Sequence, residues 1–362
     1  MGKKLMILLL TLAVLVGFSG GYVAVGLQAY SRYQQGSLAS QEHCGGQPPV
    51  HICVRAPSAI FSAFYPSYVA THYALFTIDY SSSNPLTLLI NLDISGFSQV
   101  QTQTANANAG TQSVSFTPPL LTHILGTFTA EDNTSLHVWV TDTQGHRYYV
   151  NDSPLLLHSR WLMQWVAANR LKIAAWVTPD DPAITDLIVK ATTHLQTEPP
   201  PAPTAMIGYD GASRKQVADQ VDAIFDAMRI DYQIQYIQAD VPYNGPGDSS
   251  VATQNIKLPS EVLQQHSGMC VELTALLASA VEHIGLHAEI VIIPGHAFLG
   301  VAVSPDDRHF QYWDAVLVNN GVAGASANVF ADNLYTQNVK RHTILDVILV
   351  GDARMADIGP MV

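Results

Sequence analysis

The sequence predicts an α+β protein in which a β-sandwich precedes a second domain of helices and strands, both behind an N-terminal transmembrane helix. Three observations predict this class: an uncharged run over residues 5–27, strand patterns from about residue 56 to 157, and helical periodicity after residue 180. We expect a signal anchor (1–29), a linker (30–55), the sandwich (56–160) and the second domain (161–362).

The N-terminal segment is the clearest topological signal. Residues 5–27 contain no charge, and their number matches the roughly 20 residues that a membrane-spanning helix needs. Lys3 and Lys4 precede this run, so we expect a single-pass protein of the cell membrane with its N-terminus in the cytoplasm. The alternative is a cleaved signal peptide, with Gly17 and Ser19 before the cut. Both interpretations place the remaining chain outside the cytoplasm.

The charge balance argues against one class of partner. The chain of 362 residues has 13% charged residues and a formal net charge of −12. Such a chain offers little basic surface to phosphate backbones, so we do not expect it to bind nucleic acid.

If the chain is exported, the redox state of its three cysteines can be predicted. Cys44 and Cys53 enclose CGGQPPVHIC, a loop with Gly and Pro that is short enough to bring the two sulfur atoms together. In an oxidising compartment we expect a disulfide between them, the alternative being two unpaired thiols. Cys270 is left over, and an odd thiol in an exported protein calls for an explanation.

Strand patterns between turn signals predict the sandwich. The runs YALFTIDY, LTLLINLDISGF, QSVSFT and SLHVWVTDTQGHRYYV follow one another, the last as a hairpin around Thr143–Gln144–Gly145. Strands this regular, with no helical stretch between them, favour a small sandwich of immunoglobulin-like type.

Helical patterns mark the second domain. Asp181 and Pro182 begin a helix over ITDLIVKATTHL, as N-cap and first helical residue. A second helix is expected over SRKQVADQVDAIFDAMR, and a third follows Cys270 and ends at Gly285. The apolar stripe of the third helix consists of Leu273, Leu276, Leu277, Ala280, Val281 and Ile284.

Cys270 lies in the first turn of this third helix, directly after Ser267, Gly268 and Met269. Unpaired backbone N–H groups and the positive end of the helix dipole favour a thiolate at such a position. The alternative is a cysteine that only packs as a small apolar side chain.

A histidine and a carboxylate follow on predicted strands. AEIVII and HAFLGVAV flank a Pro-Gly turn, so His296 opens the second strand of a hairpin, and HFQYWDAVLV forms a third strand. If the next turn centres near Asp306, Asp314 pairs with Phe298 and lies diagonally beside His296. A carboxylate there can orient an imidazole. Asp306 and Asp307 are the alternatives, although both fit a turn better.

At these residues the chain resembles a known family. HSGMCVELTALLASAVEHIGLHAEIVIIPGHAFLGV is similar to the core of the bacterial transglutaminase-like superfamily. KLPSEVL, AAWVTPDDPAI, MIGYDG and ILDVILVGDARMADIGPM also resemble segments of exported, membrane-anchored members, so the likeness covers about residues 170–360. The resemblance implies a papain-related fold with a Cys–His–Asp triad, whose positions match Cys270, His296 and Asp314.

The chain departs from the family pattern beside two of these positions. Met269 and Val271 flank the cysteine, where members often carry an acidic or amide residue. The aromatic residue that usually follows the histidine is present only as Phe298, two residues further on. For the oxyanion side chain the sequence offers Gln254 as a weak match.

These residues predict a membrane-anchored extracytoplasmic cysteine enzyme that acts on amide bonds as a peptidase, amidase or acyltransferase. His296 would take the proton of Cys270, and Asp314 would fix the imidazole tautomer. We expect a peptide or protein amide as substrate, with cell-wall peptide among the candidates, and no metal or organic cofactor. The alternative is a catalytically silent binding or scaffold protein of the cell envelope.

Overall fold

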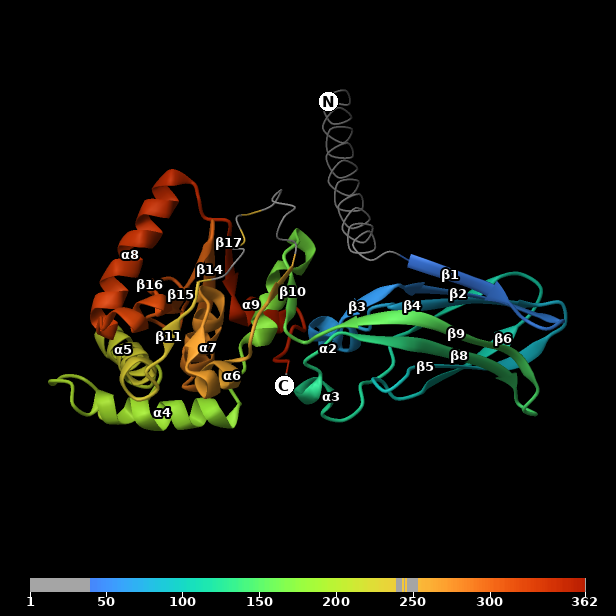
Figure 1. The fold of residues 1–362 in the computed structure, drawn as a ribbon, viewed down its shortest axis with the longest axis horizontal. Coiled ribbons are helices and arrows are strands. Elements are labelled where there is room, and N and C mark those ends of the chain that lie inside the picture. The colour runs from blue at the N-terminus through green and yellow to red at the C-terminus, as the bar shows by residue number, and fades with distance from the viewer. Residues whose placement is uncertain (1–39, 239–242, 244, 246–252, 362) are drawn as a thin grey trace, which may run out of the picture.

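The computed structural model describes residues 40–238, 243, 245 and 253–361 of the chain. These residues form two lobes: a strand-rich lobe, and a lobe in which helices surround a smaller sheet (Figure 1). The end of the described chain returns to the region between the lobes, where the Met361 N–H donates to the Ala175 carbonyl at 2.9 Å.

The strand-rich lobe consists of two sheets that enclose an apolar core. The first has the order β1-β2-β4-β7 and the second the order β3-β9-β8-β5-β6, with antiparallel neighbours except for β3 and β9. Alternate side chains along β4 are buried, as expected when one face of a sheet meets the core. The strands are β1 (Ser40–Gly45), β2 (Val50–Pro57), β3 (Ala59–Phe61), β4 (Phe76–Ser82), β5 (Leu86–Ile94), β6 (Gln101–Ala107), β7 (Gln112–Phe116), β8 (Asp132–Asp142) and β9 (Arg147–His158).

The strands of this lobe agree only partly with the sequence pattern. β8 and β9 meet in the hairpin predicted around Thr143–Gln144–Gly145, which is confirmed. β1 and β2, however, occupy the segment that the sequence predicts as a linker. Three short helices that the strand pattern does not predict also occur here, namely η1 (Ser62–Phe64), α2 (Tyr65–Ala70) and α3 (Ile124–Thr127).

The second lobe contains a four-stranded antiparallel sheet of order β16-β15-β14-β17. Helix α7 (Cys270–His283) packs on one face, with Ile290 and Ile292 in the same core. On the other face Val291 and Ile293 pack near Ala331 of helix α8 (Gly324–Arg341). Both faces are therefore covered, as the alternation of strand side chains requires. The strands are β14 (Ala288–Ile293), β15 (His296–Ala302), β16 (Phe310–Trp313) and β17 (Asp346–Leu349).

The remaining helices surround α7 and the ends of the sheet (Figure 1). The start predicted for the first of them is confirmed, because the Asp181 carboxylate accepts the Ala183 N–H at 2.9 Å and Pro182 is the first helical residue. These helices are η2 (Ala167–Trp176), α4 (Pro182–Leu195), α5 (Arg214–Ile230), α6 (Pro259–Gln265), η4 (Ala315–Asn320) and α9 (Val350–Met355). Two short strand pairs connect them, β10 (Leu162–Gln164) with β12 (Thr253–Asn255) and β11 (Gln235–Tyr236) with β13 (Ser267–Gly268).

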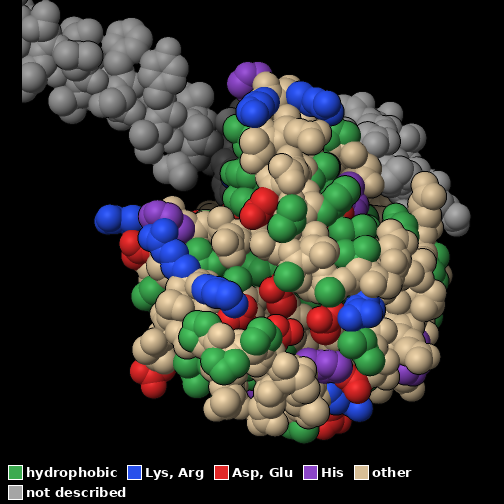
Figure 2. All heavy atoms as spheres, turned by 90° about the vertical axis from the view of Figure 1, so that its left-hand side faces the viewer, with side chains coloured by type: hydrophobic (Ala, Val, Ile, Leu, Met, Phe, Trp, Pro, Cys, Tyr) green, Lys and Arg blue, Asp and Glu red, His purple; other side chains and the backbone are tan. Residues whose placement is uncertain are grey.

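Figure 2 shows the end of the molecule where α4, α5 and α8 lie. Several acidic side chains gather near the centre of this face, and most Lys and Arg side chains lie toward its edge. Helix α5 itself brings three carboxylates to one side, Asp219, Asp222 and Asp226, at helical spacing. This face is therefore mixed in charge rather than uniformly basic.

The predicted fold class, an α+β protein with a papain-like domain, an immunoglobulin-like sandwich and a transmembrane helix, is wrong. The described chain is mixed α/β, with 34% helix and 33% strand. In the second lobe, helices cover both faces of the sheet. In the described ranges no helix has the length and apolar character needed to cross a membrane. The apolar helix α7 has only 14 residues, whereas a span needs roughly 20. The predicted anchor (1–29) lies outside the described residues.

Candidate active site

Cys270 is the first residue of α7, as the sequence predicts. Its side chain is half-buried and forms no disulfide. The first N–H groups of a helix have no acceptor within the helix, so the sulfur lies beside backbone donors and the positive end of the helix dipole. The Thr274 hydroxyl lies 2.8 Å from the Cys270 carbonyl and 3.2 Å from the Ala297 carbonyl, and it thereby ties this helix end to β15.

A buried carboxylate fixes the chain that enters α7. The Glu272 side chain accepts the N–H of Met269 and the N–H of Lys257, each at 2.8 Å. Only 3% of Glu272 is exposed, and this burial raises the pKa of its carboxyl group although the two N–H donors oppose the shift. Glu272 therefore joins the segment before α6 to the helix end that presents Cys270.

His296 stands at the start of β15, directly after the predicted turn, and the hairpin of β14 and β15 is confirmed. Its Nε2 lies 2.9 Å from Oδ2 of Asp314. Its ring and the Cys270 side chain line the same pocket, and Cys270 is close enough to raise the pKa of the imidazole. The three predicted residues are therefore brought together, since His296 contacts Asp314 and shares a pocket with Cys270. Since Nε2 is occupied by Asp314, the nitrogen available to the sulfur is Nδ1.

The register of β15 and β16 explains how Asp314 reaches His296. Leu299 pairs with Trp313, so the next position along the two strands aligns Phe298 with Asp314, as the predicted turn requires. Asp314 directly follows the last residue of β16, is 2% exposed, and also accepts the Val316 N–H at 3.3 Å.

The two alternative carboxylates lie elsewhere. Asp307 contacts Nδ1 of His287 at 2.6 Å, and Asp306 accepts the Ser304 hydroxyl hydrogen bond at 2.6 Å within the turn before β16. Both residues therefore belong to the turn before β16, as the sequence predicts. Asp314 is the carboxylate that contacts the His296 imidazole.

The environment of His296 keeps its ring protonated. Burial by itself lowers the pKa of the imidazole, but the hydrogen bonds to Asp314 and Cys270, together with their negative charges, raise it to about 10. The ring is therefore an imidazolium near neutral pH. A cation close to a cysteine is the kind of neighbour that reactive thiols have.

Cys270 and His296 line one narrow pocket, and Gln254 lies in the same wall. Pairing of β12 with β10 delivers Gln254, and its Oε1 accepts the indole N–H of Trp165 at 3.0 Å. An indole N–H can only donate, so this bond fixes which end of the amide carries the NH₂ group. That group, Nε2, lies 3.8 Å from the Met269 sulfur, next to Cys270. The full lining is Trp165, Tyr243, Gln254, Cys270, Val271, Ile292, Gly295, His296 and Ala297.

Sequence reasoning missed two residues that support the site. The indole N–H of Trp313, the neighbour of Asp314, donates to Oδ1 of Asp222 at 2.8 Å, and burial raises the pKa of Asp222 to about 7. No local pattern marks this pair, because the two residues are far apart in the chain. Glu272 does stand at the third position of a helix, where a capping carboxylate is common, but Met269 replaces the Ser or Thr that completes the signature.

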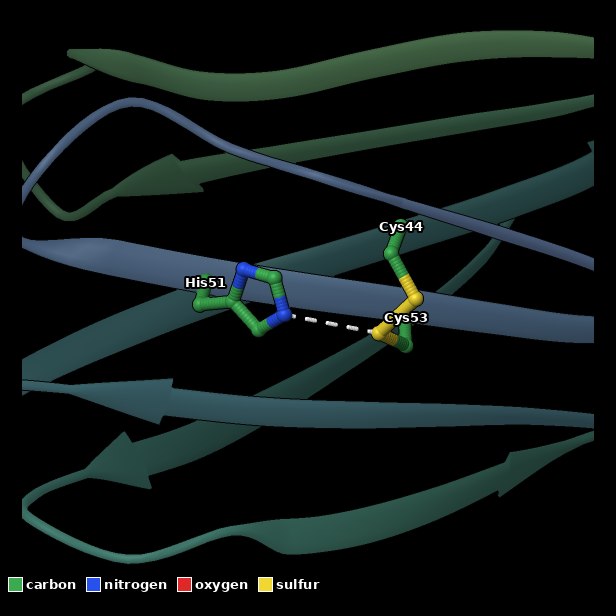
Figure 3. Close-up of side chains that lie close together, drawn as sticks. All are labelled: Cys44, His51 and Cys53. Carbon is green, nitrogen blue, oxygen red and sulfur yellow. Dashed lines mark hydrogen bonds between the residues drawn. A yellow bond between two sulfur atoms is a disulfide. The ribbon is translucent and has the colours of Figure 1, made fainter.

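The predicted disulfide between Cys44 and Cys53 is present. It joins directly opposite positions of β1 and β2, and the imidazole of His51 lies beside it (Figure 3). The disulfide is thus in the strand-rich lobe, whereas the free thiol Cys270 begins a helix of the second lobe.

No protein-family model, curated protein or solved structure matches this chain. The likeness to the transglutaminase-like superfamily therefore depends on the quoted residues alone.

Proposed function

We propose that this protein is a thiol enzyme that acts on peptide or protein amide bonds through Cys270, His296 and Asp314. The observation that supports this best is the position of the His296 ring, which is held by Asp314 at 2.9 Å and lines one pocket with Cys270. A merely structural histidine has no need of both a nucleophile and a buried carboxylate in one pocket. The resemblance to the bacterial transglutaminase-like superfamily supports the same assignment.

The reaction would proceed through an acyl-enzyme. The Cys270 thiolate attacks the amide carbonyl carbon, and the imidazolium of His296 gives its proton to the departing amine. Water or a second amine then attacks the thioester while the now neutral imidazole accepts its proton. Asp314 keeps the ring oriented and compensates its positive charge. This chemistry requires no metal or organic cofactor.

Two donors would stabilise the negative oxygen of the tetrahedral intermediate. One is the backbone N–H of Cys270, at the start of α7, which has no acceptor within the helix. The other is Nε2 of Gln254, whose amide is oriented by Trp165. Preorganised donors of this kind are often the largest single contribution to catalysis.

We place this activity outside the cytoplasm. The disulfide between Cys44 and Cys53 is typical of an oxidising compartment, and the sequence pattern of residues 5–27 is that of an export segment. Peptides of the cell envelope are therefore the substrates to test first.

Alkylation of Cys270 by iodoacetamide tests the proposal. Near pH 6 a thiol with the ordinary pKa of about 8.5 is less than about 1% ionised and reacts slowly, whereas a thiol activated by a neighbouring imidazolium reacts faster. We expect rapid alkylation near pH 6, and a rate about 100-fold lower in His296→Ala. The two rates should converge at alkaline pH, where any thiol is ionised. Mass spectrometry of the Cys270 peptide gives the rate.

His194→Ala is the matched control, because His194 pairs with Asp231 at 2.6 Å outside the pocket. This variant should keep the wild-type rate. A folded protein whose Cys270 reacts slowly near pH 6, with or without His296, would contradict an enzyme and favour the silent binding protein.

A further inference from the structure

A second group of sulfur and nitrogen ligands lies in the strand-rich lobe. Cys44 and Cys53 face each other across β1 and β2, and His51 precedes Cys53 by two residues, on the same face of β2. Nε2 of His51 lies 3.5 Å from Sγ of Cys53 (Figure 3). A disulfide sulfur has no hydrogen, so in this contact the imidazole is the donor.

These three residues are accessible from solvent. Cys44 and His51 are exposed and Cys53 is half-buried. Cys44 also borders a surface groove together with Arg147 and Tyr149. A small thiol reagent can therefore approach the Cys44 sulfur, whereas His51 covers the side of Cys53.

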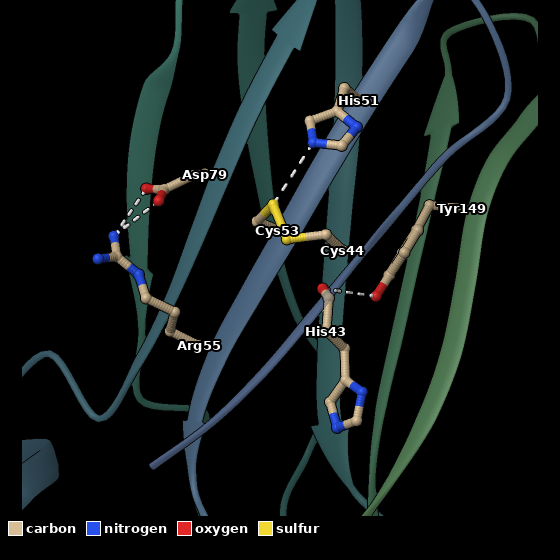
Figure 4. The surroundings of a disulfide bond; sticks show 7 residues. All are labelled: His43, Cys44, His51, Cys53, Arg55, Asp79 and Tyr149. Carbon is tan, nitrogen blue, oxygen red and sulfur yellow. Dashed lines mark hydrogen bonds and ion pairs between the residues drawn. A yellow bond between two sulfur atoms is a disulfide. The ribbon is translucent and has the colours of Figure 1, made fainter.

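The neighbouring carboxylate is already occupied. Asp79 lies opposite Cys53 where β2 pairs with β4, but its oxygens contact the Arg55 guanidinium at 2.7 Å (Figure 4). The same carboxylate also accepts the Ser113 hydroxyl. Among the residues that the structure describes, the group that remains to form a site consists of two sulfurs and one imidazole nitrogen. Thiolate and imidazole ligands select zinc or copper(I) rather than calcium or magnesium.

We propose that Cys44, Cys53 and His51 form a binding site for a soft or borderline metal ion that opens when the disulfide is reduced. All three ligand atoms lie within 4.8 Å of one another. In a tetrahedral zinc site, bonds of about 2.3 Å to sulfur and about 2.0 Å to nitrogen separate these atoms by roughly 3.5 Å. The observed 3.5 Å between His51 and Cys53 already has this value, and the two bonded sulfurs must separate.

Opening requires a dithiol reductant. Its thiolate attacks the exposed Cys44 sulfur, the bond between the cysteines breaks, and Cys53 leaves as a thiolate beside His51. The second thiol of the reductant then attacks the mixed disulfide and releases Cys44. Two electrons and two protons thus pass to the cysteines, and the reductant becomes a disulfide. Metal binding displaces the protons of both thiols, and the imidazole binds through Nε2 with its proton on Nδ1.

Cadmium titration of the full chain tests this site. The Cys270→Ser background leaves Cys44 and Cys53 as the only cysteines of the chain. After reduction with dithiothreitol and anaerobic removal of the reagent, we expect sulfur-to-cadmium charge-transfer absorption that saturates at about one Cd²⁺ per chain. The oxidised protein should show none, because its sulfurs are bonded to each other.

His51→Ala in the same background should weaken Cd²⁺ binding at least about 10-fold. His43→Ala is the matched control, since this neighbour of Cys44 points away from the disulfide (Figure 4). The proposal is overturned by reduced protein that binds no stoichiometric Cd²⁺, or by equal affinities of the two histidine variants. Loss of the far-UV circular dichroism on reduction also overturns it, because no folded site would then exist.

Discussion

At the scale of single residues, His296 is a base whose charge depends on its neighbours. Burial alone would neutralise the ring, since an imidazolium loses hydration inside a protein. The hydrogen bonds to Asp314 and Cys270 reverse this and raise the pKa to about 10. In the proposed reaction, His296 would therefore act first as a proton donor to the leaving group, rather than as the base that ionises Cys270.

Gln254 provides a test of the proposed oxyanion site. Acylation by p-nitrophenyl acetate develops a negative carbonyl oxygen, whereas alkylation by iodoacetamide does not. We expect Gln254→Ala to slow acylation about 100- to 1000-fold and to leave alkylation within about twofold of wild type. Stopped-flow absorbance gives the first rate and mass spectrometry the second.

The control for this variant is Gln264→Ala, at an exposed position of α6. It should change neither rate. Equal losses of acylation and alkylation in Gln254→Ala would mean that the amide only supports the position of Cys270.

At the scale of elements, the N-terminus of α7 is the critical feature of the site. Two backbone N–H groups from different segments, those of Met269 and Lys257, converge on the Glu272 carboxylate. The Lys257 ammonium lies 3.7 Å from the same carboxylate and compensates its charge. The Glu272 side chain thus fixes the position of the helix end, and with it the position of Cys270.

We expect Glu272→Ala to lower the free energy of unfolding by about 2–4 kcal/mol, because two buried backbone donors lose a charged acceptor. Urea denaturation followed by circular dichroism measures this loss. Glu198→Ala removes an exposed carboxylate after α4 and should cost less than about 0.5 kcal/mol. If the two variants were equally stable, Glu272 would not support the helix end.

At the scale of the whole molecule, the two lobes share one apolar core and a polar contact. The buried Arg160 guanidinium donates to the Leu125 carbonyl at 2.9 Å and pairs with Glu261 of α6 at 2.7 Å. Lys172 of η2 places its ammonium 4.6 Å from the ring of Phe64 and 4.1 Å from that of Tyr68. Two buried basic side chains, Arg160 and Lys172, therefore lie at the junction of the two lobes. The rings of Phe64 and Tyr68 contact the Lys172 ammonium.

Lys172 makes the stability of the junction depend on pH. Burial lowers its pKa from 10.5 to about 7, so between these values the unfolded chain binds more protons and stability rises with pH. Lys172→Met removes this dependence. From about pH 7 to pH 9.5, we expect wild type to gain about 2–3 kcal/mol relative to the variant, measured by urea denaturation.

Lys190→Met is the control, because Lys190 is exposed and its ammonium lies 5.3 Å from the Tyr232 ring. The difference between Lys190→Met and wild type should stay constant over this pH range. Parallel curves for Lys172→Met and wild type would show that Lys172 is not desolvated.

The residues of the candidate site could be predicted more completely than the strands and the fold class. Cys270, His296 and Asp314 each stand next to a strong local signal: a helix start, a Pro-Gly turn, and a strand whose register follows from its turn. The strands β1 and β2 were missed because Gly and Pro in their connection suggest a loop, whereas pairing with β4 decides that they are strands.

Features that depend on neighbours in the chain could be predicted: the helix that begins at Cys270, the hairpin whose second strand begins at His296, and the Cys44–Cys53 pair across one tight connection. Contacts that join distant segments could not, and they emerge only from the folded chain. Gln254 beside Cys270 is one of these contacts, and Asp222 under Trp313 is another. The physical reason is that hydrogen bonds and burial act across space, whereas propensity and periodicity describe only the local chain.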